Sequence, residues 1–191
     1  MDTETTGLNS RFDDLIEIAC VKVNILDTFE VHNEDIFHTY LKPSVPITED
    51  SKKIHGISED FLQDKPTFSE IYSKFLEFIS DGVLVAHNAP FDISFLNEAL
   101  NKINKEPIKN KIIDSLVVAR RLFKGQAVGL DRLPKLLGIN FERGFHSALE
   151  DAMILAKVYS AMMRPKQQEL FLEDVRQIKT HSYTMLTSLI E

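Results

Sequence analysis

The order of short apolar runs and helical stretches restricts the fold of this chain more than any other property of its sequence. Residues 15–23 are rich in branched apolar side chains and predict a buried strand, and residues 36–41 predict a second strand that Lys42 and Pro43 end. A third short strand is expected at residues 83–86. The spacing of apolar residues predicts helices over residues 68–79, 92–100, 115–123, 130–137 and 147–162. Early strands followed by a helix-rich second half indicate a mixed α/β domain.

The length and apolar content fit one globular domain. The 191 residues are 43% hydrophobic, which is enough for a single core. The only cysteine, Cys20, lies inside an apolar run and predicts a buried thiol in a reducing compartment. Because no signal peptide opens the chain and no apolar run approaches the roughly 20 residues that cross a bilayer, we expect a soluble, cytoplasmic protein without a membrane partner.

The net charge of −7 does not match the basic stripe by which proteins usually bind nucleic acids. Either the substrate is not a polyanion, or metal ions and partner proteins supply the attraction.

Two acids lie close together at the start of the chain, at Asp2 and Glu4. On an extended chain both carboxylates point to one side, while Thr3 and Thr5 point to the other. Neighbouring carboxylates raise each other's pKa unless a cation lies between them, and oxygen ligands suit Mg²⁺ or Mn²⁺. A solvated acidic N-terminus explains the pair more simply when it is taken alone, so the decision rests on the other motifs.

A second polar group, residues 87–92, follows the third predicted strand. Ligands in α/β proteins collect beyond strand ends, and Pro90 suits the first turn of the helix that follows. Taken alone, Asp92 is explained at least as well by a favourable interaction with the helix dipole as by metal binding.

A third group surrounds the start of the last predicted helix. Ser147 is suited to cap this helix, Asp151 falls in its first turns, and His146 lies on the loop before it. This order can bring a carboxylate and an imidazole to one cleft, and histidine is the side chain best suited to accept a proton near neutral pH. In isolation, a surface histidine explains His146 equally well.

The three groups together resemble the exonuclease motifs of the DEDDh 3′–5′ exonucleases. The matching stretches are Asp-Thr-Glu-Thr-Thr-Gly at 2–7, His-Asn-Ala-Pro-Phe-Asp at 87–92 and His-x-Ala-Leu-x-Asp-Ala at 146–152. The intervening stretches resemble the proofreading epsilon subunits of bacterial DNA polymerase III, at residues 40–43, 54–57, 64–68 and 114–116. The resemblance covers residues 2–163 and implies a ribonuclease H-like mixed sheet flanked by helices.

The resemblance also implies roles for individual residues. Four acids would hold two divalent ions, Mg²⁺ or Mn²⁺, with His146 as the general base; these acids are Asp2, Glu4, Asp92 and Asp151. The terminal nucleotide would be contacted by His55 and Asp50, together with the acids Asp2, Glu4 and Asp151; Asp50 stands where the family has glutamate. His87 and Asn88 are expected to support the strand end or to contact the nucleotide. The product would be nucleoside 5′-monophosphates from a single-stranded or frayed 3′ end.

The chain departs from the family ahead of the first motif. A full apolar strand precedes the first aspartate in the family, whereas only Met1 does so here. We therefore expect a truncated first strand, unpaired backbone groups on its neighbours and a free α-amino group beside the cation site. The corresponding hypothesis is a misplaced start or a decayed gene, with a chain that is poorly soluble or inactive until upstream apolar residues are added.

A tail at residues 164–191 is expected to follow the exonuclease domain at 1–163. Gln167, Leu170 and Phe171 resemble the Gln-x-x-Leu-Phe motif that binds the bacterial sliding clamp. A continuing amphipathic helix explains the same residues equally well, because the apolar ones keep helical spacing.

The function that these features favour is a metal-dependent proofreading 3′–5′ exonuclease of a replicative DNA polymerase. The expected partners are a DNA 3′ end, the polymerase catalytic subunit, the sliding clamp and a small accessory subunit of the polymerase core. An RNA-trimming relative, such as an oligoribonuclease or a ribonuclease T, is the enzyme alternative, because the sequence offers no readable discriminator for the 2′-hydroxyl. A replisome linker with a decayed exonuclease is the non-enzyme alternative.

Overall fold

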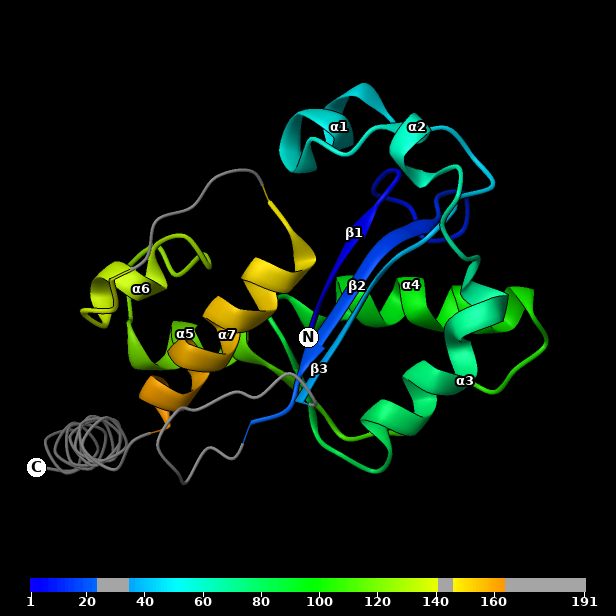
Figure 1. Ribbon diagram of the computed structural model, residues 1–191. Coiled ribbons are helices and arrows are strands. Elements are labelled where there is room, and N and C mark those ends of the chain that lie inside the picture. Colours follow the sequence, from blue (N-terminus) through cyan, green and yellow to red (C-terminus); the bar gives the residue numbers. More distant parts are fainter. Residues whose placement is uncertain (24–34, 141–145, 164–191) are drawn as a thin grey trace, which may run out of the picture.

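The computed structural model in Figure 1 describes residues 1–23, 35–140 and 146–163. The strands in these ranges are β1 (Asp2–Thr5), β2 (Leu15–Val21), β3 (Ile36–Tyr40), β4 (Leu84–Ala86) and β5 (Ile112–Asp114). The helices are α1 (Glu49–His55), α2 (Glu59–Leu62), α3 (Phe68–Ile79), α4 (Ala89–Lys102), α5 (Ser115–Leu122), α6 (Leu133–Leu136) and α7 (Ala148–Met162).

β2 is the central strand of an antiparallel sheet with the order β1-β2-β3. Its branched apolar sequence is buried from Leu15 to Cys20, since both faces of the sheet are covered. β4 and β5 form a separate parallel pair. The expected mixed α/β architecture is therefore confirmed, with one antiparallel and one parallel ladder.

Helices cover the antiparallel sheet on both faces (Figure 1). Ile18 and Cys20 of β2 share one core with Phe75 of α3 and Leu96 of α4. The intervening Ala19 points the other way and packs against α7. The alternation along β2 thus places α3 and α4 on one face and α7 on the other.

A cavity of about 580 Å³ lies between the two sheets, beyond the N-terminal end of β1. The β1–β2 ladder begins at the pair Asp2–Ala19, whereas β2 continues to Val21 while paired with β3. On the other side, the Met1 α-amino group donates to the Val85 carbonyl oxygen of β4 at 2.7 Å. The cavity lining is mainly apolar and includes Val21, Val83, Leu84, Leu155 and Tyr159.

The predicted elements agree with the structure in order and type. The helix at 68–79 has the expected bounds, and the strands at 15–23, 36–41 and 83–86 are each slightly shorter in the structure. The helix expected at 92–100 begins earlier, at Ala89, because Asn88 turns the chain with a φ of 72° and Pro90 fits the first turn. The helix expected at 130–137 is shortened to α6.

Three short elements were not predicted, namely α1, α2 and β5. α1 begins where the Thr48 side chain accepts a hydrogen bond from the Ser51 amide, and it ends at Gly56 with a φ of 70°. The sequence of α1 is mostly charged and has no apolar residues at helical spacing, so it does not predict a helix. β5 contributes only two apolar residues, Ile112 and Ile113, which are too few for a recognisable strand pattern.

Within the described ranges, no helix combines the length and the apolar content that crossing a membrane would require.

Candidate active site

The acids of β1 point to the face of the sheet that α7 covers. Asp2 pairs with Ala19, which packs against α7, and Glu4 pairs with Glu17 on the same face. Thr3 pairs with Ile18 and points to the opposite face, where its hydroxyl donates to Asp92 Oδ1 at 2.8 Å. The alternation predicted for residues 2–5 is therefore the alternation that the structure has.

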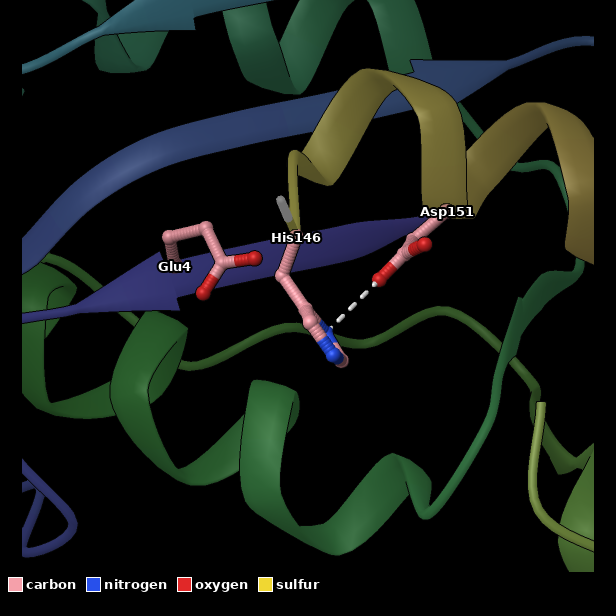
Figure 2. A group of neighbouring side chains, drawn as sticks. All are labelled: Glu4, His146 and Asp151. Atoms are coloured by element: carbon pink, nitrogen blue, oxygen red, sulfur yellow. Dashed lines mark ion pairs between the residues drawn. The ribbon is translucent and has the colours of Figure 1, made fainter. Parts of the chain in front are cut away.

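α7 brings a histidine and an acid to Glu4. One potential ligand atom from each of Glu4, His146 and Asp151 lies within 4.8 Å of the other two. Figure 2 shows Glu4 on β1 facing the His146 ring and the Asp151 carboxylate beside it. His146 Nδ1 is 3.4 Å from Asp151 Oδ2, and the ring is 41% exposed while Asp151 is buried. We refer to these three residues as the Glu4 cluster.

Two further acids adjoin the Glu4 cluster. Burial raises the pKa of Asp92 from its ordinary value of 3.8 to about 6, against the opposing effect of the Thr3 hydroxyl. Burial also raises the pKa of Asp2 well above 3.8, and the charges of Asp92, Asp151 and Glu4 add to that effect. The Met1 α-amino group lowers both pKa values, so this positive group does lie beside the acids. Asp2 therefore connects Asp92 with the Glu4 cluster.

This arrangement fits a divalent cation. Buried carboxylates that raise each other's pKa are unfavourable when charged, and a cation between them removes the penalty. The carboxylates of Asp2, Glu4, Asp92 and Asp151 offer oxygen donors, and oxygen donors suit hard divalent ions.

His87 and Asn88 bind protein groups at the end of β4. His87 Nδ1 lies 2.9 Å from the Ser115 hydroxyl at the start of α5, and the Asn88 amide donates to Asp114 Oδ1 at 3.0 Å. These contacts join the end of β4 to β5 and α5. They agree with the first of the two expectations for His87 and Asn88, which was support of the strand end.

The two expected nucleotide contacts of α1 differ in position. His55 is buried, its Nδ1 accepts from the Ile57 amide at 3.0 Å, and burial lowers its pKa. The neighbouring Ile54 carbonyl oxygen accepts from the His146 backbone amide at 3.2 Å, so the end of α1 lies beside the Glu4 cluster. Asp50, by contrast, has a side chain that is 93% exposed and lies 3.1 Å from Lys53 Nζ. The structure thus brings His55 to the site and leaves Asp50 in solvent.

The expected clamp-binding residues Gln167, Leu170 and Phe171 lie outside the described residues, as does the whole of the predicted tail at 164–191.

The loop after β1 presents apolar side chains that the sequence analysis did not assign. Leu8 is 80% exposed and Phe12 is 73% exposed. The loop is closed at its base, because the Thr6 amide donates to the Asp14 carbonyl oxygen and the Asp14 amide donates to the Thr6 hydroxyl, both at 2.9 Å. The one sequence feature that could have indicated this exposed apolar loop is the position of Leu8 directly after the motif at residues 2–7.

Gly7 permits a close approach inside this loop. A Cβ at this position would lie 2.4 Å from Asp13 Oδ2, and that oxygen accepts a hydrogen bond from the Asn9 amide at 2.8 Å. Glycine therefore allows the loop to close next to the acids of β1.

Comparison with known proteins reveals similarity over nearly the whole described chain. Residues 1–159 match the exonuclease family RNase_T. The chain is 44% identical over 172 residues to the DNA polymerase III subunit epsilon of Buchnera aphidicola subsp. Baizongia pistaciae, covering 85% of this chain and 69% of that protein. It is 41% identical over 180 residues to the DNA polymerase III subunit epsilon of Rickettsia felis, covering 91% and 77%.

Solved structures share the fold. Exonuclease X in complex with 5′ overhanging duplex DNA superposes with a TM-score of 0.66 at 25% identity, over 89% of this chain and 96% of that chain. The nuclease domain of 3′hExo, a DEDDh family member bound to rAMP, superposes with a TM-score of 0.68 at 19% identity, over 85% and 88%. The ribonuclease H-like arrangement expected for residues 2–163 is thereby confirmed.

Proposed function

We propose, from the premise that this chain belongs to the RNase_T exonuclease family, that it is the proofreading 3′–5′ exonuclease of a replicative DNA polymerase. The observation that carries the proposal is the Glu4 cluster, which β1 and α7 bring together next to Asp2 and Asp92. A non-catalytic linker has no need for buried acids held in mutual repulsion. The chain is accordingly a metal-dependent exonuclease.

We assign the metal ligands to Asp2, Glu4, Asp92 and Asp151. Their oxygen-rich character suits Mg²⁺ or Mn²⁺. Asp2 interacts electrostatically with Asp92, Glu4 and Asp151, which supports our proposal that the four acids together hold two ions. When bound, such ions activate a water molecule and stabilise the leaving 3′ oxygen.

His146 is assigned as the general base. Its ring is partly exposed, so a water molecule can reach it, and Asp151 lies beside Nδ1. A carboxylate next to Nδ1 favours the tautomer with a proton on that nitrogen, which leaves Nε2 to accept a proton from the attacking water. Glu4 on β1 and Asp151 on α7 both lie close to the His146 ring, so they hold it in place.

The proposed substrate is the 3′ end of single-stranded or frayed DNA. Unpaired bases stack on aromatic and apolar side chains, and Leu8 and Phe12 present such side chains on the loop after β1. His55, buried beside the cluster, is the proposed contact to the terminal nucleotide from α1.

The proposed partners follow from the charge and the relatives. A net charge of −7 gives weak general attraction to DNA, so a complex that delivers the DNA end favours catalysis. The relatives are named as subunits of DNA polymerase III, which supports association with a polymerase core. We propose that the catalytic subunit, the sliding clamp and a small accessory subunit are partners, with Gln167, Leu170 and Phe171 as the clamp-binding residues.

The function is tested with matched primer-templates in Mg²⁺. We expect release of deoxynucleoside monophosphates, faster from a 3′ terminal mismatch than from a paired end, because the mismatched end frays more easily. Asp2→Ala and Asp151→Ala should nearly abolish release, whereas Glu77→Ala, which removes an exposed acid of α3, should leave it unchanged. Unchanged rates in the first two variants would remove the metal assignment. A strong preference for RNA dinucleotides over DNA would replace proofreading with the RNA-trimming alternative.

A further inference from the structure

Glu17 is a fully buried acid that the proposed mechanism does not use. It lies in the middle of β2, and none of its side chain is exposed to solvent. An ionisable side chain in such a place is rare unless hydrogen bonds or a charge compensate its burial. The partners of Glu17 therefore indicate why an acid stands here.

The Glu17 carboxylate binds two elements that are far apart in the sequence. Oε1 lies 2.7 Å from His38 Nε2 on β3 and accepts from the Ser147 hydroxyl at 3.1 Å. Oε2 accepts from the Ala148 backbone amide, also at 3.1 Å. Ser147 and Ala148 form the start of α7, where a backbone amide lacks a partner within the helix. One carboxylate thus fastens the beginning of α7 to the centre of the sheet.

The same strand position also faces the catalytic acids. Glu17 is the cross-strand partner of Glu4, so the two carboxylates occupy neighbouring positions on one face. Like charges directly opposite each other destabilise a sheet unless they are compensated separately. The N-terminus of α7 and His38 therefore compensate the buried charge of Glu17.

The residues that Glu17 holds lie between two residues of the Glu4 cluster. His146 directly precedes Ser147, and the Asp151 amide donates to the Ser147 carbonyl oxygen at 2.9 Å. A shift of the first turn of α7 would therefore move His146 and Asp151 together relative to Glu4. The His146 backbone amide also donates to the Ile54 carbonyl oxygen at 3.2 Å, which connects this segment to α1.

We propose that Glu17 is a positioning residue of the exonuclease, which sets the start of α7 so that His146 and Asp151 meet Glu4. The inference rests on the proposed function of the site. A displacement of about 1 Å in a catalytic group can reduce a rate about 100-fold, so the effect of losing this anchor is measurable.

Two substitutions of similar volume separate hydrogen bonding from packing. Glu17→Gln keeps one carbonyl oxygen that can accept from the Ala148 amide, whereas Glu17→Met fills the same space without an acceptor. We expect kcat to fall about 10-fold in Glu17→Gln and about 100-fold in Glu17→Met, with KM for a single-stranded oligonucleotide within about threefold of the original value. Partial rescue by glutamine distinguishes a hydrogen-bonded anchor from a merely buried side chain.

Ile18→Val supplies the control for stability. Ile18 is equally buried in β2, but it points to the opposite face and packs in the core that α3 and α4 cover. We expect this variant to lower the unfolding temperature while leaving kcat unchanged. If Ile18→Val and Glu17→Gln both lose kcat in proportion to their loss of stability, the positioning role of Glu17 is wrong.

Two further readouts do not depend on turnover. Glu17→Met should weaken Mn²⁺ binding, which is measured as the decrease of the electron paramagnetic resonance signal of free Mn²⁺. In the metal-free protein it should also speed amide hydrogen exchange at Ala148. Should Glu17→Met fail to fold, Glu17→Gln and Ser147→Ala carry the same measurements. Unchanged kcat, Mn²⁺ binding and exchange in Glu17→Gln and Ser147→Ala would overturn the inference. A different result would overturn the proposed function alone: the original chain shows no exonuclease activity but binds Mn²⁺, and the Glu17 variants bind Mn²⁺ more weakly.

Discussion

Removing the charge of Asp92 should reduce the loss of stability that rising pH causes in the metal-free protein. Asp92 holds a proton more tightly in the folded state, where its pKa is about 6, than in the unfolded chain, where the ordinary value is 3.8. Between these values the folded state binds more protons, so its stability falls as pH rises. At neutral pH the difference corresponds to about 3 kcal/mol of lost stability. Asp2 contributes in the same direction, because its pKa is also raised.

The prediction is best measured as a difference between two proteins. His55 and His87 have pKa values lowered by burial, so their contribution to stability rises with pH and opposes that of Asp92. Urea unfolding of the original chain and of Asp92→Asn, in a chelator from pH 4 to pH 7.5, cancels the histidine contribution. Relative to the original chain, Asp92→Asn should gain about 3 kcal/mol over this range.

Metal binding should produce the complementary result. A ligand that binds only the folded state stabilises it by mass action, and the acids bind a cation only when they are deprotonated. Mg²⁺ should therefore raise the unfolding free energy of the original chain more at pH 7.5 than at pH 5, and less in Asp92→Asn. An identical pH dependence for the two proteins without metal would refute the reasoning, as would an equal Mg²⁺ effect. Glu77→Gln, at an exposed acid of α3, should match the original chain throughout.

Three other predictions concern the base, the tail and the cavity. His146→Ala should reduce the release of deoxynucleoside monophosphates about 10²- to 10⁴-fold, as expected for a positioned proton acceptor, and a loss below about threefold would remove His146 from that role. Replacing Leu170 and Phe171 with alanine should weaken binding to the cognate sliding clamp, measured by surface plasmon resonance, while oligonucleotide hydrolysis stays intact. If clamp binding persists and the variant unfolds instead, the tail is a continuing amphipathic helix. Adding about six to eight apolar residues ahead of Met1 should fill the cavity between the sheets and raise the unfolding temperature, because each buried apolar side chain contributes about 1.5–3 kcal/mol. An unchanged unfolding temperature and activity would contradict that expectation.

Residues whose partners follow from local periodicity were predictable from the sequence. The period of 2 along β1 places Asp2 and Glu4 on one face, and the first turn of α7 carries Asp151 close to His146. Asp92 was equally accessible, because it follows a strand end and Pro90 marks the helix start. For these side chains, short-range geometry fixes the direction in which each one points.

Residues whose partners depend on tertiary register were not predictable. Glu17 occurs in an apolar run, and its role becomes visible only when the β2–β3 register brings His38 near it and α7 docks on the same face. The cap at Thr48 places Asp50 in the first turn of α1 with its side chain in solvent, and its expected contact with the nucleotide stays a prediction. No periodic pattern in a single sequence specifies either orientation.

The assembly of the site from β1 and α7 has a consequence for the newly made protein. Asp151 leaves the ribosome 147 residues after Glu4. At a synthesis rate of about 5–20 residues per second, the acids of β1 wait about 7–30 s for the helix that completes their site. During that interval the nascent chain lacks Asp151, one of the proposed metal ligands, and for almost all of it His146, the proposed general base. Nuclease activity therefore begins only after α7 has been translated and has packed on the sheet, so an unfinished chain does not degrade nucleic acid near the ribosome.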